Sequence, residues 1–373
     1  MNRLVLIGNG FDIAHGLNTR YKDFFLWYWF QWGRRLLKGT NKTESDGLCT
    51  FKLKDTIESP CWGYVWGSYY QRKDILKPWD ANEVIGIAMK ERELCDFDMS
   101  PFLNRIFKSY VSKKWVDIEN EYYSLLIEEK VDYKKGYILP DYKELNSHLD
   151  ILRNQLIQYL QSESEKKTSV INEIKDKIYR PILKREIAVA NPLHYDFRTN
   201  DENHPSGIML LNFNYTKTPE FYTVNKDNAD INYIHGRLDA PESVIFGYGD
   251  ELDSGFQKLR NQNNNEALRH IKSIRYLESD NYRRMLEFIE SAPFQVCIMG
   301  HSCGNSDRTL LNTLFEHRNC ISIKPYFHQI SENEDNYLEL VQNISRNFTD
   351  MKLMRDRVVN KTYCEPLTNS NNN

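Results

Sequence analysis

The sequence lacks any apolar run that approaches the ~20 residues a helix needs to cross a bilayer. Its first residues read directly as a strand, without the basic segment and apolar core of a signal peptide. These two absences favour a cytoplasmic protein that has no contact with a membrane.

Paired cysteines and an excess of one charge are also missing. The seven cysteines are odd in number and none is spaced Cys-x-x-Cys, which argues against a disulfide framework and a structural zinc site. Lys+Arg 49 and Asp+Glu 52 give a net charge of −3, which argues against strong nucleic-acid binding. We therefore expect reduced thiols and no metal. The 373 residues, 40% of them hydrophobic, allow one large domain or two ordinary ones.

The most informative segment is the first one. Leu4 to Ile7 reads as a fully buried strand, and the turn Gly8-Asn9-Gly10 follows it. A helical pattern covers residues 19–36, with Thr19 as a candidate N-cap. A strand, a Gly-x-Gly turn and a helix together can bind a phosphate through backbone N–H groups, although many such turns only close a corner.

Strand-like runs return in the second half of the chain and alternate with helical patterns. This alternation predicts an α/β fold with a Rossmann-like, doubly wound parallel sheet. The expected strands are 207–213, 231–234, 243–246, 294–299 and 320–324, and helical patterns cover 265–289 and 306–318.

Residues 38–205 differ in character, and we expect them to form a large helical insertion. Helical patterns cover 85–95, 100–130, 142–165 and 169–188. The expected division is a nucleotide-binding core of 1–37 and 206–350, the insertion 38–205, and a C-terminal extension 351–373 with a disordered tail. The aromatic run at 24–32 predicts a buried helix, with a partner surface as the alternative.

Polar and glycine-rich residues follow the predicted strands. Parallel sheets bind ligands at the carboxyl ends of their strands, so these residues define a candidate cleft. Each also has a purely structural explanation: Asn214 as a helix cap, His235 as a turn residue, and Ser306 or Asp307 as an N-cap. The residues in question are Gly8 to Asp12, Asn214-Tyr215, His235-Gly236, Gly247 to Asp250, and Gly300 to Asp307.

The order of these motifs resembles the sirtuin-like NAD-binding fold. The matching segments are Gly8-Asn9-Gly10 with Gly16-Leu17, Phe213-Asn214-Tyr215, Ile234-His235-Gly236, and Gly300-His301-Ser302 with Asp307. The chain departs from sirtuins by lacking a four-cysteine zinc module, by Phe11-Asp12 in the first turn, and by Thr216 where an Asp follows the Asn-Tyr pair. These departures argue against protein deacetylation.

The chain more specifically resembles the AbiH family of bacterial abortive-infection proteins. Ile7 to Asp12 with His15-Gly16-Leu17 is similar to the N-terminal signature of that family, and Gly300 to Gly304 with Ser306-Asp307 is similar to its C-terminal signature. The resemblance implies a role in phage defence, with a phage-derived activator and a homo-oligomer as expected partners.

Together the two resemblances imply NAD, or a related nucleotide, as substrate or ligand. Breaking the nicotinamide–ribose bond passes through an oxocarbenium-like state. Asn214 would then position water or ribose, His235 would accept a proton, and Asp12 would stabilise the cation or orient a hydroxyl. Asp307 would bind a ribose hydroxyl or cap its helix. The remaining nucleotide-binding candidates are Gly8, Asn9, Gly10, Phe11, Tyr215, Gly236, Gly300, His301 and Ser302.

Other functions stay open at this point. One alternative is a nucleotide-sensing module that uses the same cleft without turnover. Another is an interaction protein whose functional surface is the aromatic helix at 24–32. A nuclease fits least, because we see no paired acidic metal motif.

Overall fold

The computed structural model describes residues 1–38, 43–53, 80–90, 95–114, 116–128, 130–132, 136–138, 140–188, 191 and 202–369. The chain forms two compact units: Met1–Thr19 with Leu160–Asn373, and Arg20–Tyr159. Each is described separately. The functional division at residues 37, 205 and 350 stays a prediction.

The first unit contains a five-stranded parallel sheet, which confirms the α/β expectation. Its order is β10-β9-β1-β11-β12. The strands are β1 (Asn2–Ile7), β9 (Ile208–Asn212), β10 (Ala229–Tyr233), β11 (Phe294–Met299) and β12 (Cys320–Tyr326). The continuous apolar runs of β1 and β9 are typical of parallel strands buried on both faces.

All five strands end in one row. Ile7 pairs with Asn212 on one side and with Met299 on the other, Asn212 pairs with Tyr233, and Met299 pairs with Tyr326. The strand order reverses between β1 and β11, because β9 and β10 extend the sheet to one side of β1 and β11 and β12 extend it to the other. The residues after these strands therefore emerge along one edge.

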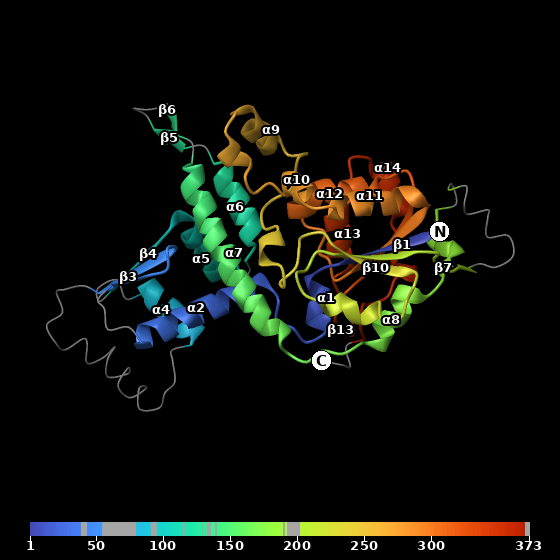
Figure 1. The fold of residues 1–373 in the computed structure, drawn as a ribbon, viewed down its shortest axis with the longest axis horizontal. Coiled ribbons are helices and arrows are strands. Elements are labelled where there is room, and N and C mark those ends of the chain that lie inside the picture. The colour runs from blue at the N-terminus through green and yellow to red at the C-terminus, as the bar shows by residue number, and fades with distance from the viewer. Residues whose placement is uncertain are drawn as a thin grey trace. The chain divides into compact units, whose positions relative to one another are not determined.

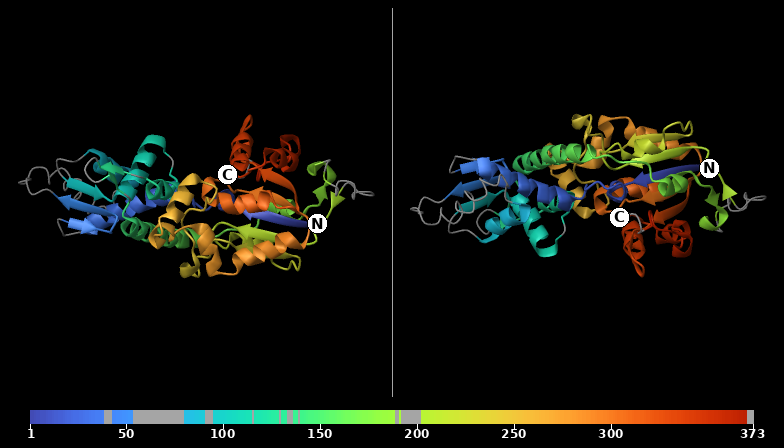
Figure 2. Two further views of the ribbon diagram at one scale, coloured as in Figure 1. Left: turned by 90° about the horizontal axis from the view of Figure 1, so that it is seen from above. Right: turned by 90° about the horizontal axis from the view of Figure 1, so that it is seen from below.

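Helices cover both faces of this sheet (Figures 1 and 2). On one face Leu4, Leu6 and Val296 pack against α11 (Asn281–Ser291), α12 (Arg308–Phe315), α13 (Tyr337–Arg346) and α14 (Met351–Arg357). On the other face Val5, Ile7 and Cys297 pack against α1 (Asn9–Ala14) and α8 (Asn172–Tyr179). Alternate residues of β1 thus supply two separate cores.

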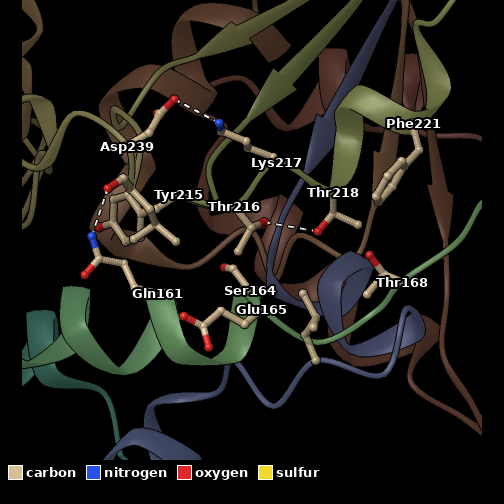
Figure 3. Close-up of a pocket in the computed structure, with 12 residues that line it drawn as sticks. Gln161, Ser164, Glu165, Thr168, Tyr215, Thr216, Lys217, Thr218, Phe221 and Asp239 are labelled. Atoms are coloured by element: carbon tan, nitrogen blue, oxygen red, sulfur yellow. Dashed lines mark hydrogen bonds and ion pairs between the residues drawn. The ribbon is translucent and has the colours of Figure 1, made fainter.

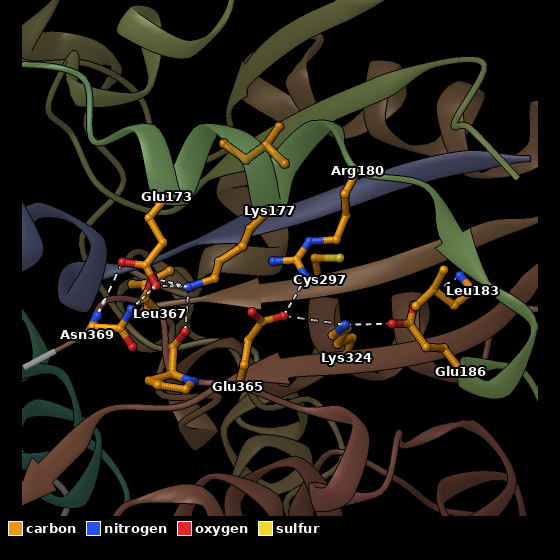
Figure 4. Close-up of polar contacts among 12 residues, drawn as sticks. Glu173, Lys177, Arg180, Leu183, Glu186, Cys297, Lys324, Glu365, Leu367 and Asn369 are labelled. Atoms are coloured by element: carbon orange, nitrogen blue, oxygen red, sulfur yellow. Dashed lines mark hydrogen bonds and ion pairs between the residues drawn. The ribbon is translucent and has the colours of Figure 1, made fainter. Parts of the chain in front are cut away.

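The face that carries α8 also holds buried charges (Figure 4). Lys324 on β12 lies 2.6 Å from Glu186, and both side chains are almost fully buried. The ammonium of Lys177 on α8 donates to Glu173 and to the carbonyls of Pro366 and Leu367 at 2.6 to 2.9 Å. The segment before residue 370 is therefore fixed to the sheet layer through Lys177.

The second unit is built around the aromatic helix. Helix α2 (Tyr21–Lys38) buries most of its aromatic side chains, and Trp29 lies 6.0 Å from the Phe97 ring and 5.4 Å from the Phe107 ring, between centroids. Core packing is therefore the correct interpretation of the run at 24–32. Around α2 are the antiparallel strands β2 (Thr43–Ser45), β3 (Cys49–Leu53) and β4 (Cys95–Met99), with α4 (Ala81–Lys90), α5 (Pro101–Lys113), α6 (Ile118–Leu126) and most of α7 (Tyr142–Ser164).

Several element predictions need correction. Residues 243–246 form no strand but a buried loop after a 3₁₀ turn at Pro241–Ser243. The predicted helix at 100–130 is two helices, because Lys114 adopts the left-handed conformation and Asp117 caps α6. The predicted helix at 169–188 ends at Tyr179, where Pro181 keeps Arg180 extended. Residues 85–95 include the end of α4 and the first residue of β4, with 91–94 outside the described ranges.

Two corrections concern the site. A short additional helix, α1, begins directly after β1 at Asn9. The expected helix is α2, which starts at Tyr21, so Thr19 is not its N-cap. The expected helix at 265–289 is four short pieces: 3₁₀ turns at Asn265–Leu268 and Tyr276–Glu278, α10 (Lys272–Arg275) and the start of α11. Within the described ranges, no helix combines the length and apolar character needed to cross a bilayer.

Candidate functional site

The loops that follow β1 and β11 touch each other at the point where the strand order reverses. The N–H group of Gly10 donates to the carbonyl of Gly300 at 2.8 Å, and that of Gly8 to Met299 at 3.2 Å. Gly300 has a φ of 74°, and a Cβ atom there would lie 2.1 Å from the nitrogen of Phe11. A Cβ on Gly8 would lie 2.4 Å from the Cα of His301. Only glycine permits this approach, so the two signature motifs form one joined structure.

This joint, the contact between the loops that follow β1 and β11, involves the same N–H groups that were predicted to bind phosphate. The N–H groups of Gly8, Gly10 and Phe11 all donate to protein carbonyls, and the side-chain oxygen of Asn9 accepts from the Thr19 hydroxyl. A pyrophosphate would have to replace the bonds between the two loops. Phosphate binding by Gly8, Asn9 and Gly10 therefore stays a prediction that requires this turn to open.

Beside the joint lies a buried charged centre around Asp307. One of its carboxylate oxygens is 2.9 Å from Nζ of Lys272 and 3.2 Å from Nε2 of His235, and the other is 3.7 Å from Nε2 of His301. All four residues are buried. Burial alone would raise the pKa of Asp307, but the ammonium of Lys272 and the imidazole of His235 hold this pKa well below its usual value. Asp307 is thus a carboxylate at neutral pH.

Asp307 directly precedes α12, yet its side chain makes no capping hydrogen bond. The alternative that this residue only caps its helix is therefore wrong for its side chain. Its carboxylate is directed instead to Lys272 and the histidines.

Both imidazoles of the centre are held in fixed orientations. The Nδ1 atom of His235 lies 3.2 Å from the carbonyl oxygen of Phe213, and its Nε2 lies 3.1 Å from the Tyr276 hydroxyl. His301 Nδ1 accepts a hydrogen bond of 3.0 Å from the N–H of Cys303, so a neutral His301 carries its proton on Nε2, which faces Asp307. Cys303 reaches this position with a φ of 55°, a conformation that costs energy in a residue with a side chain.

Asn214 connects this centre with the first loop. Its Nδ2 donates to the carbonyl of Gly8 at 2.9 Å, and its side chain is half-buried. Asn214 is not a helix cap, because the next helical turn begins at Thr218. The amide also stabilises the ionised form of Asp12, so Asn214 connects the first loop with that carboxylate.

Asp12 belongs to a second, separate group of residues. Both of its carboxylate oxygens lie 2.8 to 2.9 Å from the hydroxyl of Thr216, which donates to them. Burial raises the pKa of Asp12 to about 6, although hydrogen bonds from Thr216, Thr218 and Asn214 act in the opposite direction. The groups that stabilise this buried charge are hydroxyls and an amide, not a cation.

A pocket of about 320 Å³ lies over the threonines that hold Asp12 (Figure 3). All of its lining residues belong to the first unit. They are Leu17, Gln161, Ser164, Glu165, Thr168, Tyr215, Thr216, Lys217, Thr218, Phe221, Leu238 and Asp239.

The structure divides the predicted site residues. Gly8, Gly10, Asn214, His235, Gly300, His301 and Asp307 come together at the centre, whereas Tyr215 lines the pocket and Asp12 is buried behind its lining residue Thr216. Of the others, Phe11 lies in the core beside Tyr222, Gly236 packs against Ser243, and Ser302 is exposed with its carbonyl bonded to Asn343.

Sequence reasoning missed Lys272 and Tyr276. Both come from the segment expected to be one continuous helix, and no motif marks them. Within the described ranges, no group of His, Cys, Asp or Glu is arranged to hold a metal ion. At Asp307 the ammonium of Lys272 takes the position that a cation would occupy.

The fold and this centre together define an α/β protein whose buried charged residues lie at the carboxyl edge of a parallel sheet. The family described as "Bacteriophage abortive infection AbiH" matches residues 4–329, so this chain belongs to the AbiH family. The match includes both loops of the joint and every residue of the charged centre. Comparison with curated proteins and with solved structures gives no match.

Proposed function

We propose that this chain acts in abortive infection by binding NAD, or a related nucleotide, at the carboxyl edge of the sheet and hydrolysing its nicotinamide–ribose bond. The observation that carries the proposal is the buried centre of Asp307, Lys272, His235 and His301 at the reversal of strand order. Open parallel sheets bind ligands at such reversals.

The strand order supports a nucleotide as the ligand. With the strands taken in chain order, the sheet reads third, second, first, fourth, fifth, which is the arrangement of doubly wound dinucleotide-binding sheets. We therefore assign the core to a Rossmann-like, sirtuin-like fold. This assignment is part of the proposal.

Hydrolysis of the nicotinamide–ribose bond needs few catalytic groups, and the residues of this centre can supply them. Nicotinamide leaves as a neutral molecule, so no strong acid is needed, but the positive charge that develops on the ribose needs stabilisation. In the proposed mechanism Nδ1 of His235 keeps its contact with the carbonyl of Phe213, and the opening of the centre replaces the contact between Nε2 and Asp307 by one with water or a ribose hydroxyl. Nε2 then accepts a proton from that group, a role worth about 10²–10⁴-fold in rate. Asn214 positions that water or hydroxyl, and Ser302 at the surface contacts phosphate or ribose.

The centre is closed in this structure. His235 and Asp307 are only 4% and 8% exposed. Substrate entry therefore requires the turn at 300–306 or the segment at 272–278 to move. A phage-derived activator, or assembly into a homo-oligomer, would supply that movement in infected cells.

A second candidate function is nucleotide sensing without turnover. The observation that favours it is the set of hydrogen bonds that already occupy the N–H groups of Gly8 and Gly10. A ligand that breaks this joint would move the loops of β1 and β11 apart, and that movement would itself be the signal.

The proposal is tested by incubating the purified chain with NAD and quantifying nicotinamide and ADP-ribose by mass spectrometry. The comparison includes Asn214→Ala, His235→Ala and Asp307→Asn, with the exposed His328→Ala as a matched control. Each sample is run with and without extract of phage-infected cells. Product from the wild type and His328→Ala, but not from the other variants, supports hydrolysis at this centre.

Two other outcomes decide against it. Saturable NAD binding without product in either condition selects the sensing function. If His235→Ala and Asp307→Asn still form product, this centre does not catalyse the reaction.

A further inference from the structure

The pocket over Asp12 is a second candidate binding site, separate from the charged centre. Its lining includes none of the four residues around Asp307. Its volume of about 320 Å³ is at the lower end of the range for small-molecule sites. The chemistry of its walls therefore indicates what class of ligand fits it.

Two hydroxyl groups that line this pocket, those of Thr218 and Ser164, already donate their hydrogens within the protein. Thr218 Oγ1 donates to Thr216 Oγ1 at 3.3 Å, and Thr216 in turn donates to Asp12. Ser164 Oγ donates to the carbonyl of Leu160 at 2.7 Å. Because a hydroxyl has one hydrogen, Thr218 and Ser164 can only accept a further hydrogen bond. These two positions thus favour a ligand that donates.

The charges around the pocket favour a cation. Asp12 is a buried carboxylate beneath the floor, and Glu165 makes no ion pair among the described residues. Lys217 is paired with Asp239 at 3.0 Å, and Arg237 forms two hydrogen bonds with the same Asp239 at 2.8 and 2.9 Å. With these groups charged, three carboxylates face two cations, which leaves an excess of negative charge.

The remaining walls are apolar. Leu17, Leu238 and the ring of Phe221, which is 40% exposed, lie among the lining residues. Figure 3 shows Phe221 and Thr218 on one side and Gln161 with Glu165 on the other. An apolar ligand body can pack on Leu17 and Phe221, while its N–H groups reach Thr218 on the same side and Ser164 and Glu165 on the other.

We propose that this pocket binds a small organic cation whose N–H groups donate to Thr218, Ser164 and Glu165 and whose apolar part packs on Leu17 and Phe221. Primary amines, amidines and guanidines with a compact apolar body belong to this class. The site goes beyond nucleotide hydrolysis, because no residue of the Asp307 centre takes part in it.

The test uses benzamidine and benzamide, which share one shape but differ in charge. Binding of each to the full chain is measured by isothermal titration calorimetry at about pH 7.5, where the amidine is protonated. We expect benzamidine to bind at least about tenfold more tightly than benzamide, a ratio that a net carboxylate charge in a partly buried pocket can supply. Glu165→Gln and Thr218→Val should each weaken benzamidine about three- to tenfold. The exposed Glu332→Gln, outside the pocket, is the matched control and should change nothing.

A pH arm tests the contribution of Asp12. With its pKa at about 6, Asp12 is neutral at about pH 5, so benzamidine should bind less tightly there. The other ionisable groups near Asp12 and the pocket are His15, Glu165, Lys217, Glu220, Arg237 and Asp239. The isosteric Asp12→Asn separates them from Asp12: it should weaken binding at about pH 7.5 and reduce the loss on acidification, provided that circular dichroism shows a folded protein.

The proposal is overturned if benzamide binds as tightly as benzamidine, or if neither ligand binds. It is also overturned if Glu165→Gln, Thr218→Val and Asp12→Asn all bind like the wild type. None of these measurements uses NAD, so the proposal for this pocket and the proposal of NAD hydrolysis can be refuted independently.

Discussion

The Nζ atom of Lys272 lies 2.9 Å from Oδ1 of Asp307, and the two side chains are 1% and 10% exposed. The pair joins the short helix α10 to the residue that precedes α12. A buried ion pair rarely adds much stability compared with apolar residues of equal size. Its presence at the carboxyl edge, between two histidines, therefore favours a functional reason for keeping it.

Removing one partner of this pair should be costly. In Lys272→Met the Asp307 carboxylate loses its cation, and we expect the free energy of unfolding to fall by about 3–5 kcal/mol. The measurement is urea unfolding near neutral pH. The double variant Lys272→Met/Asp307→Leu, which removes both charges, should recover most of this loss. If Lys272→Met alone is as stable as the wild type, the pair is not buried as described.

Gly300→Ala should break the joint between the two signature loops. A methyl group at this position would lie 2.1 Å from the backbone nitrogen of Phe11, and the φ of 74° disfavours any side chain. We expect a loss of several kcal/mol, on the order of a severe core substitution, measured as the shift in Tm. Gly86→Ala, where the structure shows open space around the new Cβ, is the matched control and should be neutral or slightly stabilising in its helix.

The carboxyl edge could be predicted because its signal is local. Apolar runs such as Leu4–Ile7 end in glycines and polar residues, and parallel strands place those ends in one row, so the position of Asn214, His235 and Asp307 at this edge follows from the sequence. Lys272 and Tyr276 could not be found. Their segment keeps helical spacing through several short turns, and the single extended residues that separate those turns, Ile271 and Ser279, do not disturb the pattern. The pocket over Asp12 has no local signal in the sequence, because four separate segments build it.

Asp12 should make stability depend on pH. Its folded pKa of about 6 lies above the ordinary value of 3.8, so the folded state binds the proton more tightly than the unfolded state. Protonated Asp12 contributes fully to the free energy of unfolding below about pH 4. This contribution, roughly 3 kcal/mol in total, is lost as the pH rises through 6. Asp12→Asn keeps an acceptor for Thr216 without the charge, so it should be more stable than the wild type at neutral pH and similar at about pH 4. Unfolding curves across this range provide the measurement, and equal stability of the two proteins at neutral pH would contradict the burial of an ionised Asp12.

The C-terminal segment should be required for folding of the first unit, although the family match ends at residue 329. Leu367 is buried in the core that covers Val5 and Ile7, and its carbonyl accepts from Lys177 at 2.9 Å. Truncation after residue 363 would expose that core and leave the ammonium of Lys177, which is 2% exposed, with only Glu173 as a partner. We expect a loss of about 3 kcal/mol or more, since a buried charged donor without its acceptors carries a penalty of that order. Truncation after residue 369 keeps these contacts and is the matched control. Thermal unfolding of the two truncated chains decides the matter, because equal Tm values would mean that the segment lies on the sheet layer without stabilising it.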